Sequence, residues 1–459
     1  MRLLISRDRP APSWAMALVM LAMLACTEEI ELLPCAADQD CPGIMRCDAG
    51  RCFHRVPPWT VPPCSSPVAG TRCCDLEDPV LPTEGRCRTT LMDGADALSA
   101  PARGPDGTLV VTLRTGTSLE VAGFGPDGTE RWREEAGLVA MGSAAPVPRV
   151  AGDGRVWVAQ GERVWTRDAG GGIQELDPGG LVDGDLAACS GGLAVALVRG
   201  PGGRGPRRLP RDGEGWGLAR PLDVPFALPP AISLPDGIVA VAYADGAVTI
   251  LGLEDGEARG EHTSAHTATG VTGLAADGEG ALWISSADGV LERLSVTGPP
   301  TAGYVKIVLP DLQHTPPVIP AGGRVICALG DGQVVQGDDL HAPAPALLAE
   351  LVTRAPGTLA LLEGEGFLLL GGCPEGRCLA FAYDDSASFF GAAFESIGEH
   401  RHPGLPPDAA VGLPGPEGVA ALSAGGRLDG LVVAGPARNA PWPGPDGGPG
   451  NGRCMEGTP

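Results

Sequence analysis

Most of this chain repeats one short unit. Beyond about residue 98, alternating apolar segments are separated by Asp-Gly, Pro-Asp-Gly or Gly-Gly turns, as in "LPPAISLPDGIVAVAYADGAVTILGLEDGE" and "VTGLAADGEGALWISSADGVLERLS". Each copy reads as a strand, a turn, a central strand rich in Val, Ile and Ala, a second turn and a third strand. We expect type I′ turns at the Asp-Gly pairs, because that turn needs positive φ at both central residues.

The repeat has the size of one blade of a β-propeller. A glycine marker recurs every 37 to 52 residues, at Gly107, Gly154, Gly191, Gly237, Gly278, Gly323, Gly366 and Gly418. A four-stranded blade has this length. A two-layer sandwich is the alternative, but about eight copies are more than one sandwich requires. Because no window has sustained helical periodicity, we predict an all-β fold, a β-propeller of about eight four-stranded blades.

The repeat also carries a family resemblance over residues 98–435. The order Pro-Ala, Asp-Gly, strand, Asp-Gly, strand, Asp-Gly resembles the quinoprotein-like (PQQ-like) β-propeller repeat. Residues 126–132, "PDGTERW", match the Gly-x-x-x-Trp that ends blades in that family. Proteins with this propeller include quinone-dependent dehydrogenases and a lipoprotein that supports outer-membrane barrel assembly. The resemblance therefore implies a fold and leaves the function open.

The N-terminus has the pattern of an export signal. Three Arg residues precede an apolar run over residues 14–24, which ends in Ala25 and Cys26. Eleven residues are too few to span a bilayer stably, so we predict a signal peptide over residues 1–25. The segment "MLAC" resembles the lipobox of bacterial lipoproteins, which implies that Cys26 is lipidated and becomes the mature N-terminus. The alternative is an ordinary secretory signal, with Cys26 as one more disulfide partner.

Residues 26–97 form a Cys-rich segment that we predict to be a disulfide-stapled stalk. Its first four cysteines are spaced C-x5-C-x5-C-x4-C, with almost no apolar residue between them to build a core. So short a unit holds its shape through cross-links or metal, and an exported protein is free to form disulfides. The C-x2-C spacing of zinc knuckles is missing. The segment resembles the small Cys-rich modules of myxobacterial surface proteins.

A second group of cysteines follows the Pro-rich joint "RVPPWTVPPC". Its adjacent pair, Cys73 and Cys74, is expected to enter two separate bridges, although a strained ring between the neighbours is the alternative. Cys373 and Cys378 flank a turn and are expected to staple a hairpin. The disulfide candidates are Cys35, Cys41, Cys47, Cys52, Cys64, Cys73, Cys74, Cys87, Cys373 and Cys378. Their connectivity cannot be deduced from the sequence.

Three cysteines remain outside these groups. Cys189 and Cys327 lie in apolar, strand-like runs, where we expect buried inert thiols. Cys454 lies in the Pro/Gly-rich tail, residues 436–459, which has too few apolar residues to pack and is predicted to be flexible. The thirteen cysteines after Cys26 are an odd number, so at least one thiol is unpaired within a monomer.

Charge and motifs narrow the possible chemistry. The formal net charge of −23 repels phosphate backbones and anionic lipids, so nucleic acid is not an expected partner. The sequence has no G-x-S-x-G elbow, Walker loop or H-E-x-x-H. The His pairs 262/266 and 400/402 lie in loop-like contexts, where solvated blade connections are the favoured interpretation over copper or zinc sites. We expect Trp157, Trp165 and Trp283 to lie in the blade cores.

These observations favour a binding protein over an enzyme. Quinone enzymes of the related family hold calcium and quinone with acidic and Asn side chains, whereas the only two Asn here, Asn439 and Asn451, lie in the tail. We therefore expect no cofactor, no metal and no catalytic residues. The predicted function is a noncatalytic β-propeller scaffold for envelope proteins, lipid-anchored at the outer membrane. The alternative is a propeller enzyme, either a quinone-dependent oxidoreductase or a carbohydrate-active one.

Overall fold

The computed structural model divides the chain into two compact units, Met1–Thr60 and Val61–Pro459. It describes residues 45–48, 51–54, 88–125, 129–139, 145–210, 220–277, 280–296, 305–309, 311–319, 325–330, 333–337, 346–350, 354–361, 367–373, 376–382, 400–405, 410–413, 419–432, 444 and 453–455. The described part of the first unit is one antiparallel hairpin, β1 (Met45–Asp48) and β2 (Arg51–His54), in which Cys47 is opposite Cys52 in register.

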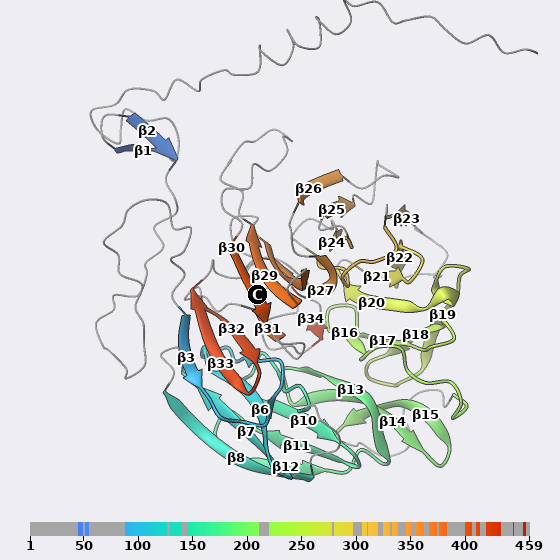
Figure 1. The fold of residues 1–459 in the computed structure, drawn as a ribbon. Coiled ribbons are helices and arrows are strands. Elements are labelled where there is room, and N and C mark those ends of the chain that lie inside the picture. Colours follow the sequence, from blue (N-terminus) through green and yellow to red (C-terminus); the bar gives the residue numbers. More distant parts are fainter. Residues whose placement is uncertain are drawn as a thin grey trace, which may run out of the picture. The chain divides into compact units, whose positions relative to one another are not determined.

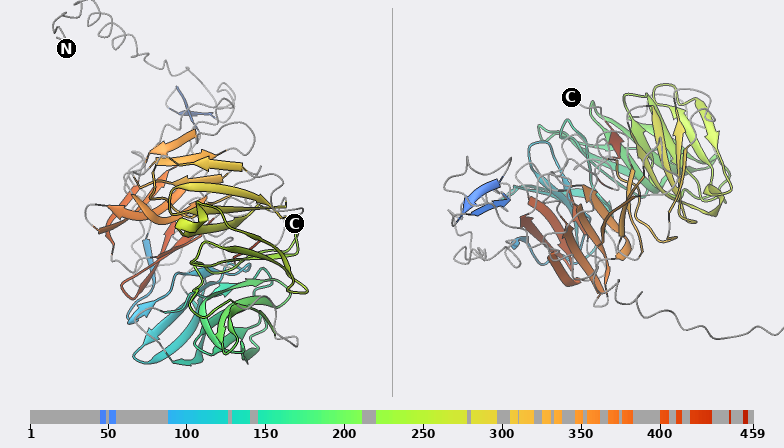
Figure 2. Two further views of the ribbon diagram at one scale, coloured as in Figure 1. Left: turned by 90° about the vertical axis from the view of Figure 1, so that its right-hand side faces the viewer. Right: turned by 90° about the horizontal axis from the view of Figure 1, so that it is seen from above.

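The second unit contains eight sheets among its described residues, and their strands pair antiparallel except for one parallel pair (Figure 1 and Figure 2). The first four blades are built from β4 (Ala97–Leu98), β5 (Ala102–Arg103), β6 (Leu109–Thr115), β7 (Ser118–Phe124) and β8 (Glu130–Val139); β9 (Arg149–Val150), β10 (Val156–Gln160), β11 (Arg163–Arg167) and β12 (Ile173–Leu176); β13 (Leu181–Cys189), β14 (Leu193–Gly200) and β15 (Gly203–Leu209); and β16 (Ala231–Ser233), β17 (Ile238–Ala242), β18 (Val248–Gly252) and β19 (Ala258–His262). The all-β propeller prediction is confirmed.

The last four blades follow the same plan. They are built from β20 (Val271–Ala276), β21 (Ala281–Ser286), β22 (Val290–Ser295) and β23 (Val305–Val308); β24 (Val325–Ala328), β25 (Gln333–Gly337) and β26 (Ala346–Glu350); β27 (Arg354–Leu361), β28 (Phe367–Cys373), β29 (Gly376–Ala382) and β30 (His400–Leu405); and β31 (Ala410–Gly412), β32 (Val419–Ala424) and β33 (Arg427–Val432). The helical part of the described residues is a short 3-10 turn, η2 (Thr267–Thr269). No helix among the described residues is long and apolar enough to cross a membrane.

Two strands from the ends of the unit complete the ring of blades. β3 (Arg88–Met92) pairs antiparallel with β33, so the eighth blade takes its outer strand from the N-terminal side of the first. β34 (Cys454–Met455) pairs parallel with β16 in the fourth blade. The stalk predicted over residues 26–97 and the flexible tail predicted over 436–459 are corrected at these positions, because Arg88–Met92, Ala97 and Cys454–Met455 pair with strands of the propeller.

The blades are held together by apolar residues between neighbouring sheets. Trp157, Trp165 and Trp283 are almost completely buried in these cores, as predicted. One core contains side chains from the first and eighth blades, including Leu98 and Leu428, and this contact closes the ring. Each blade has two apolar faces, and each face is buried against one of the two neighbouring blades. The central strands are therefore apolar at nearly every position.

The Asp-Gly turns differ from the expected type I′ geometry. Within the described residues, the glycines of these turns have positive φ but their Asp residues do not. In the turn after β9, the Gly154 amide bonds the Ala151 carbonyl at 2.9 Å, and the Asp153 carboxylate accepts the Arg155 amide at 3.1 Å. The same Asx contact recurs at Asp106 and Asp245. Asp is therefore selected by its hydrogen bond to the amide two residues on, and Gly by its left-handed backbone.

Candidate functional site

The inner edge of the fourth blade is occupied by a strand from the far end of the chain. Cys454 of β34 lies opposite Ile232 of β16 in a parallel register. The Ile232 amide donates to the Arg453 carbonyl, and the Leu234 amide donates to the Met455 carbonyl, both at 2.9 Å. The ring therefore holds an extended segment by the backbone hydrogen bonds of strand addition (Figure 1).

This edge faces the middle of the ring. The first strands of consecutive blades contact one another, β5 with β9, β9 with β13, β13 with β16 and β16 with β20. These strands therefore gather around the axis, and β34 lies on the axial side of β16, in contact with β13 as well. We call Cys189, Pro230, Ile232 and Leu234, which meet the tail here, the inner-edge site.

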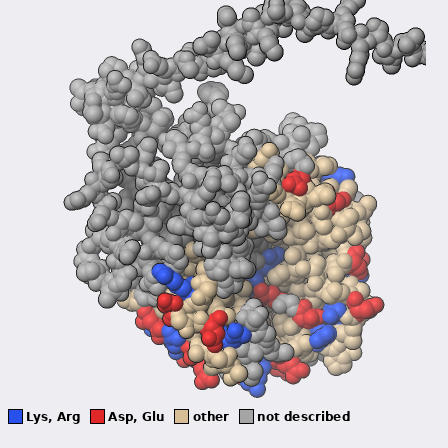
Figure 3. Space-filling model, in the orientation of Figure 1, with Lys and Arg blue, Asp and Glu red and all other residues tan. Residues whose placement is uncertain are grey.

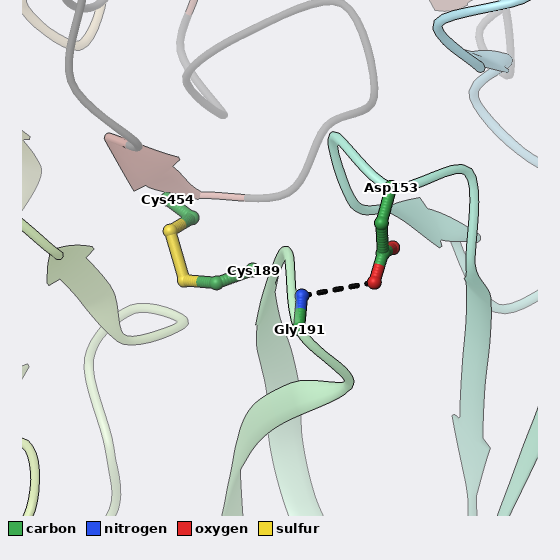
Figure 4. Close-up of a disulfide and its surroundings, with 4 residues drawn as sticks. All are labelled: Asp153, Cys189, Gly191 and Cys454. Atoms are coloured by element: carbon green, nitrogen blue, oxygen red, sulfur yellow. Dashed lines mark hydrogen bonds between the residues drawn. A yellow bond between two sulfur atoms is a disulfide. The ribbon is translucent and has the colours of Figure 1, made fainter.

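A disulfide fixes β34 in the inner-edge site. Cys189, the last residue of β13, is bonded to Cys454, with 5.5 Å between their Cα atoms (Figure 4). The bond joins the third blade to a segment 265 residues later in the chain. The expectation of an inert thiol at Cys189 is therefore wrong, because its strand ends where the tail enters the ring.

Cys327 is a buried free thiol, as expected, and burial raises its pKa. Once Cys189, Cys454 and Cys327 are accounted for, the cysteines left after Cys26 are the ten predicted disulfide candidates, an even number. The odd count in the sequence was the one signal of an unpaired thiol. It could not identify which cysteine is unpaired.

The residues beside Cys454 are anchored in different ways. Met455 is buried in an apolar core that also contains Leu274 and Leu329, from blades five and six. Arg453 is also buried, and its Nε donates to the Pro230 carbonyl at 2.9 Å. Its φ of 51° is the one left-handed backbone among the described non-glycine residues, so the tail adopts a costly conformation to enter the site.

Polar contacts surround the inner-edge site. On the inner strands, the buried guanidinium of Arg149 in β9 forms an ion pair with Asp185 in β13. Asp153, in the turn of the second blade, accepts the Gly191 amide at 2.9 Å (Figure 4). It also accepts the Gly192 amide at 3.3 Å. These amides belong to the turn directly after Cys189. The second blade therefore holds the disulfide-bearing end of β13 in place.

A second polar cluster lies between blades four and five. Asp288 is within hydrogen-bond distance of His266, 2.6 Å from Oδ2 to Nδ1, and Lys306 Nζ is 2.5 Å from His266 Nε2. Burial raises the pKa of Asp288, but the hydrogen bonds from His266 and Ser286 outweigh it and hold this pKa below its usual value. Lys306 is the only lysine of the chain.

The expectation of a solvated loop at His262 is wrong, because His262 ends strand β19 and its side chain is only 13% exposed. His262 Nε2 lies 3.0 Å from the carboxylate of Glu292, which is fully buried, and Ser264 donates to the same oxygen at 3.0 Å. The two histidines therefore stabilise separate carboxylates rather than share a ligand. Within the described part of the chain, no three His, Cys, Asp or Glu side chains gather as metal ligands would.

The remaining predicted residues are the other disulfide candidates, Cys26 and the second pair of histidines. Cys373 and Cys378 lie on β28 and β29, where their register partners are Gly376 and Gly371, so the staple between them stays a prediction. The hairpin register of Cys47 and Cys52 likewise leaves their bonding untested. Seven predicted sites lie outside the described residues, namely Cys26, Cys35, Cys41, Cys64, Cys73, Cys74 and Cys87. His400 and His402 are in β30, where only the backbone is described.

The described face in Figure 3 carries acidic and basic side chains side by side. Arg131 pairs with Asp106 at 3.0 Å, and Arg163 pairs with Glu175 at 3.2 Å, all of them on the surface. Such exposed pairs contribute little stability, at most about 1 kcal/mol each. On the described part of this face, these pairs neutralise part of the acidic charge locally.

Comparison with known proteins gives similarities of structure. No family model matches the sequence, and no curated protein matches it. The chain is similar to a streptogramin B lyase, with 11% identity, 74% of this chain and 95% of that chain covered, and a TM-score of 0.44. It is also similar to BamB from Moraxella catarrhalis, with 13% identity, coverage of 75% and 99%, and a TM-score of 0.48. A chain of a mitotic checkpoint complex has 12% identity, coverage of 63% and 89%, and a TM-score of 0.45.

Proposed function

We propose that this chain is a noncatalytic binding scaffold for proteins of the bacterial cell envelope. One observation carries the proposal: the ring binds an extended segment, β34, through the backbone groups of an inner strand. In strand addition, main-chain hydrogen bonds supply affinity, while pockets for alternate side chains supply specificity. A ring of blades presents such edges on a rigid frame and needs no reactive group to use them.

The anchor of this scaffold is the lipid that we propose on Cys26. The export signal and the "MLAC" segment support it, and the net charge of −23 makes electrostatic attachment to anionic lipids unfavourable. We propose the outer membrane as the location. Cys26→Ser removes the sulfur that would carry the lipid, so the variant is expected to leave the membrane fraction or to accumulate as precursor.

The partners that suit this scaffold carry basic or edge-strand segments. The excess of acidic residues attracts basic partners over several ångströms and speeds their encounter, an effect that weakens as salt is added. After encounter, a segment in extended conformation can pair with an exposed strand edge.

Site-directed photo-cross-linking in native envelopes tests the proposal. A photoreactive residue at Pro235, exposed in the β16–β17 turn, reports on the face next to the inner-edge site. The same residue at Ile173, which is 48% exposed on the outer strand β12, is the matched control. We expect discrete protein adducts from Pro235, fewer at high salt, and none of the same mass from Ile173.

Two kinds of result, one from cross-linking and one from an activity assay, would overturn the proposed scaffold function. One is the same set of adducts from both positions, or none from Pro235. The other is saturable binding of pyrroloquinoline quinone with calcium, together with reduction of an electron-acceptor dye by alcohols or sugars. That second result would establish the propeller as an enzyme.

A further inference from the structure

The described part of the tail, residues 453–455, is held at the inner-edge site by backbone pairing and by two of its side chains. β34 comprises two residues, and its pairing with β16 is accompanied by the buried side chain of Met455 and by the bond from Arg453 to the Pro230 carbonyl. The left-handed backbone of Arg453 opposes these contacts, because a residue with a Cβ adopts this conformation only at a cost in free energy. The Cys189–Cys454 disulfide adds a covalent bond to these contacts of residues 453–455.

Departure of the tail would leave a site with defined chemistry. The amides of Ile232 and Leu234 would lose the carbonyl acceptors of Arg453 and Met455, although these two donors stay on an ordered strand edge. The Pro230 carbonyl would lose its donor, and the space that Met455 fills in the core of blades four to six would open. Buried backbone groups need partners, so such an edge favours another extended segment.

The occupant also defines the sequence that the site accepts. Its three residues have different roles. The basic side chain of Arg453 reaches the Pro230 carbonyl, the small Cys454 lies beside Cys189, and the apolar side chain of Met455 enters the core. A segment of the form basic, small, apolar in extended conformation reproduces all three contacts.

We propose that the inner-edge site is a peptide-binding site for such a basic-small-apolar segment of a partner protein. β34 is its built-in occupant, and the Cys189–Cys454 disulfide locks it in place. A dithiol opens the lock: each cysteine sulfur gains one electron and one proton, and the dithiol loses two of each as it closes to a cyclic disulfide. The inference rests on the proposed function, because it names the segment that the scaffold binds and what controls access to it.

Peptide binding to the full-length chain tests this inference. The probe is a fluorescent peptide of residues 449–459 with Ser in place of Cys454, and the readout is fluorescence anisotropy. The oxidised wild type is expected not to bind, because its own tail is covalently fixed in the site. The Cys454→Ser variant should bind, and Cys454→Ser with Met455→Asp should bind at least about tenfold more tightly, because the tethered competitor is then weakened.

Two controls separate strand addition from misfolding. A probe whose Met is replaced by Asp should lose at least about tenfold in affinity for the double variant, because a charge cannot enter the apolar core without a partner. Wild type treated with a dithiol, a second route to the open site without substitution, should bind the probe as Cys454→Ser does. Hydrogen exchange at Ile232 and Leu234 should speed up in the double variant and slow again when the probe is added.

Equal binding of the Met and Asp probes, or no binding by the double variant and the dithiol-treated wild type, would overturn the inference. Either result is distinguishable from failure of the scaffold function. Cross-links from Pro235 in native envelopes, with the tail in place, report on the scaffold alone and do not require exchange of the tail.

Discussion

At the scale of single residues, His314 gives the ring a pH-dependent contact. Its Nδ1 donates to the Leu312 carbonyl at 3.1 Å, and its Nε2 lies 3.3 Å from the hydroxyl of Thr272. Burial lowers its pKa below the usual 6.5, although the Leu312 carbonyl and the charges of Asp311 and Asp288 act in the opposite direction.

A lowered folded-state pKa means that protonation favours the unfolded chain. The contribution of neutral His314 is present above pH 6.5 and is lost as the pH falls through the lower folded-state value. We predict an NMR titration midpoint for His314 below 6.5, and a smaller loss of stability between pH 7 and pH 5 in His314→Gln. A midpoint at or above 6.5 would contradict the buried contact.

Glycines of the Asp-Gly turns differ in how tightly they are enclosed. Gly246 has a φ of +86°, and a Cβ there would collide with the Thr267 carbonyl oxygen. Gly237 has a φ of +63° and open space around it. We predict that Gly237→Ala lowers the free energy of unfolding by about 1 kcal/mol through its backbone strain. Gly246→Ala should cost at least about 1 kcal/mol more, as measured by chemical denaturation. Equal losses would contradict the contact.

Sequence reasoning found these turns but misjudged their geometry. The Asp-Gly spacing predicted where strands end, because few other pairs combine a left-handed residue with a side chain that caps its neighbour's amide. It did not distinguish a type I′ turn from the observed pattern, since both place Gly at a positive φ. The φ of the Asp depends on how many residues separate the paired strands, and that register is set by the tertiary fold.

At the scale of elements, the two strands from outside the repeats were the ones that the sequence did not reveal. β3 and β34 are short and lie in Cys-rich and Pro/Gly-rich contexts. β34 has only two residues, too few to show an alternating pattern, and β3 contains two Thr but follows directly on the Cys-rich segment. Each becomes ordered because a finished blade offers it an edge, which is a property of the partner strand and cannot be read from the segment itself.

The tie on β34 has a measurable effect on stability. Cys454→Ser frees the tail and removes a cross-link that spans 265 residues, so we predict a loss of about 2–4 kcal/mol in the free energy of unfolding. In the presence of a dithiol, the wild type and the variant should unfold together, because both then lack the bond. Cys327→Ala, at a buried free thiol, is the control and should keep the dithiol-dependent difference. An oxidised wild type no more stable than Cys454→Ser would contradict the tie.

At the scale of the whole molecule, the period of the repeat was enough to predict a propeller of about eight blades, because each blade repeats the same strand pattern. The inner-edge site was not predictable in the same way. It joins Cys189 in the third blade, Ile232 in the fourth and Cys454 at the end of the chain, and only ring closure brings these positions together. The odd number of cysteines indicated that at least one was unpaired. It contained no information about distance in space.

The C-terminal strand β34 is bonded into the middle of the ring. Peptide mapping of the mature protein, alkylated and digested without reduction, tests it most directly. The structure predicts a cross-linked pair of peptides containing Cys189 and Cys454, and alkylation of Cys327 only after denaturation. Cys454 recovered in alkylated form, or bonded to a cysteine of residues 35–87, would contradict the account.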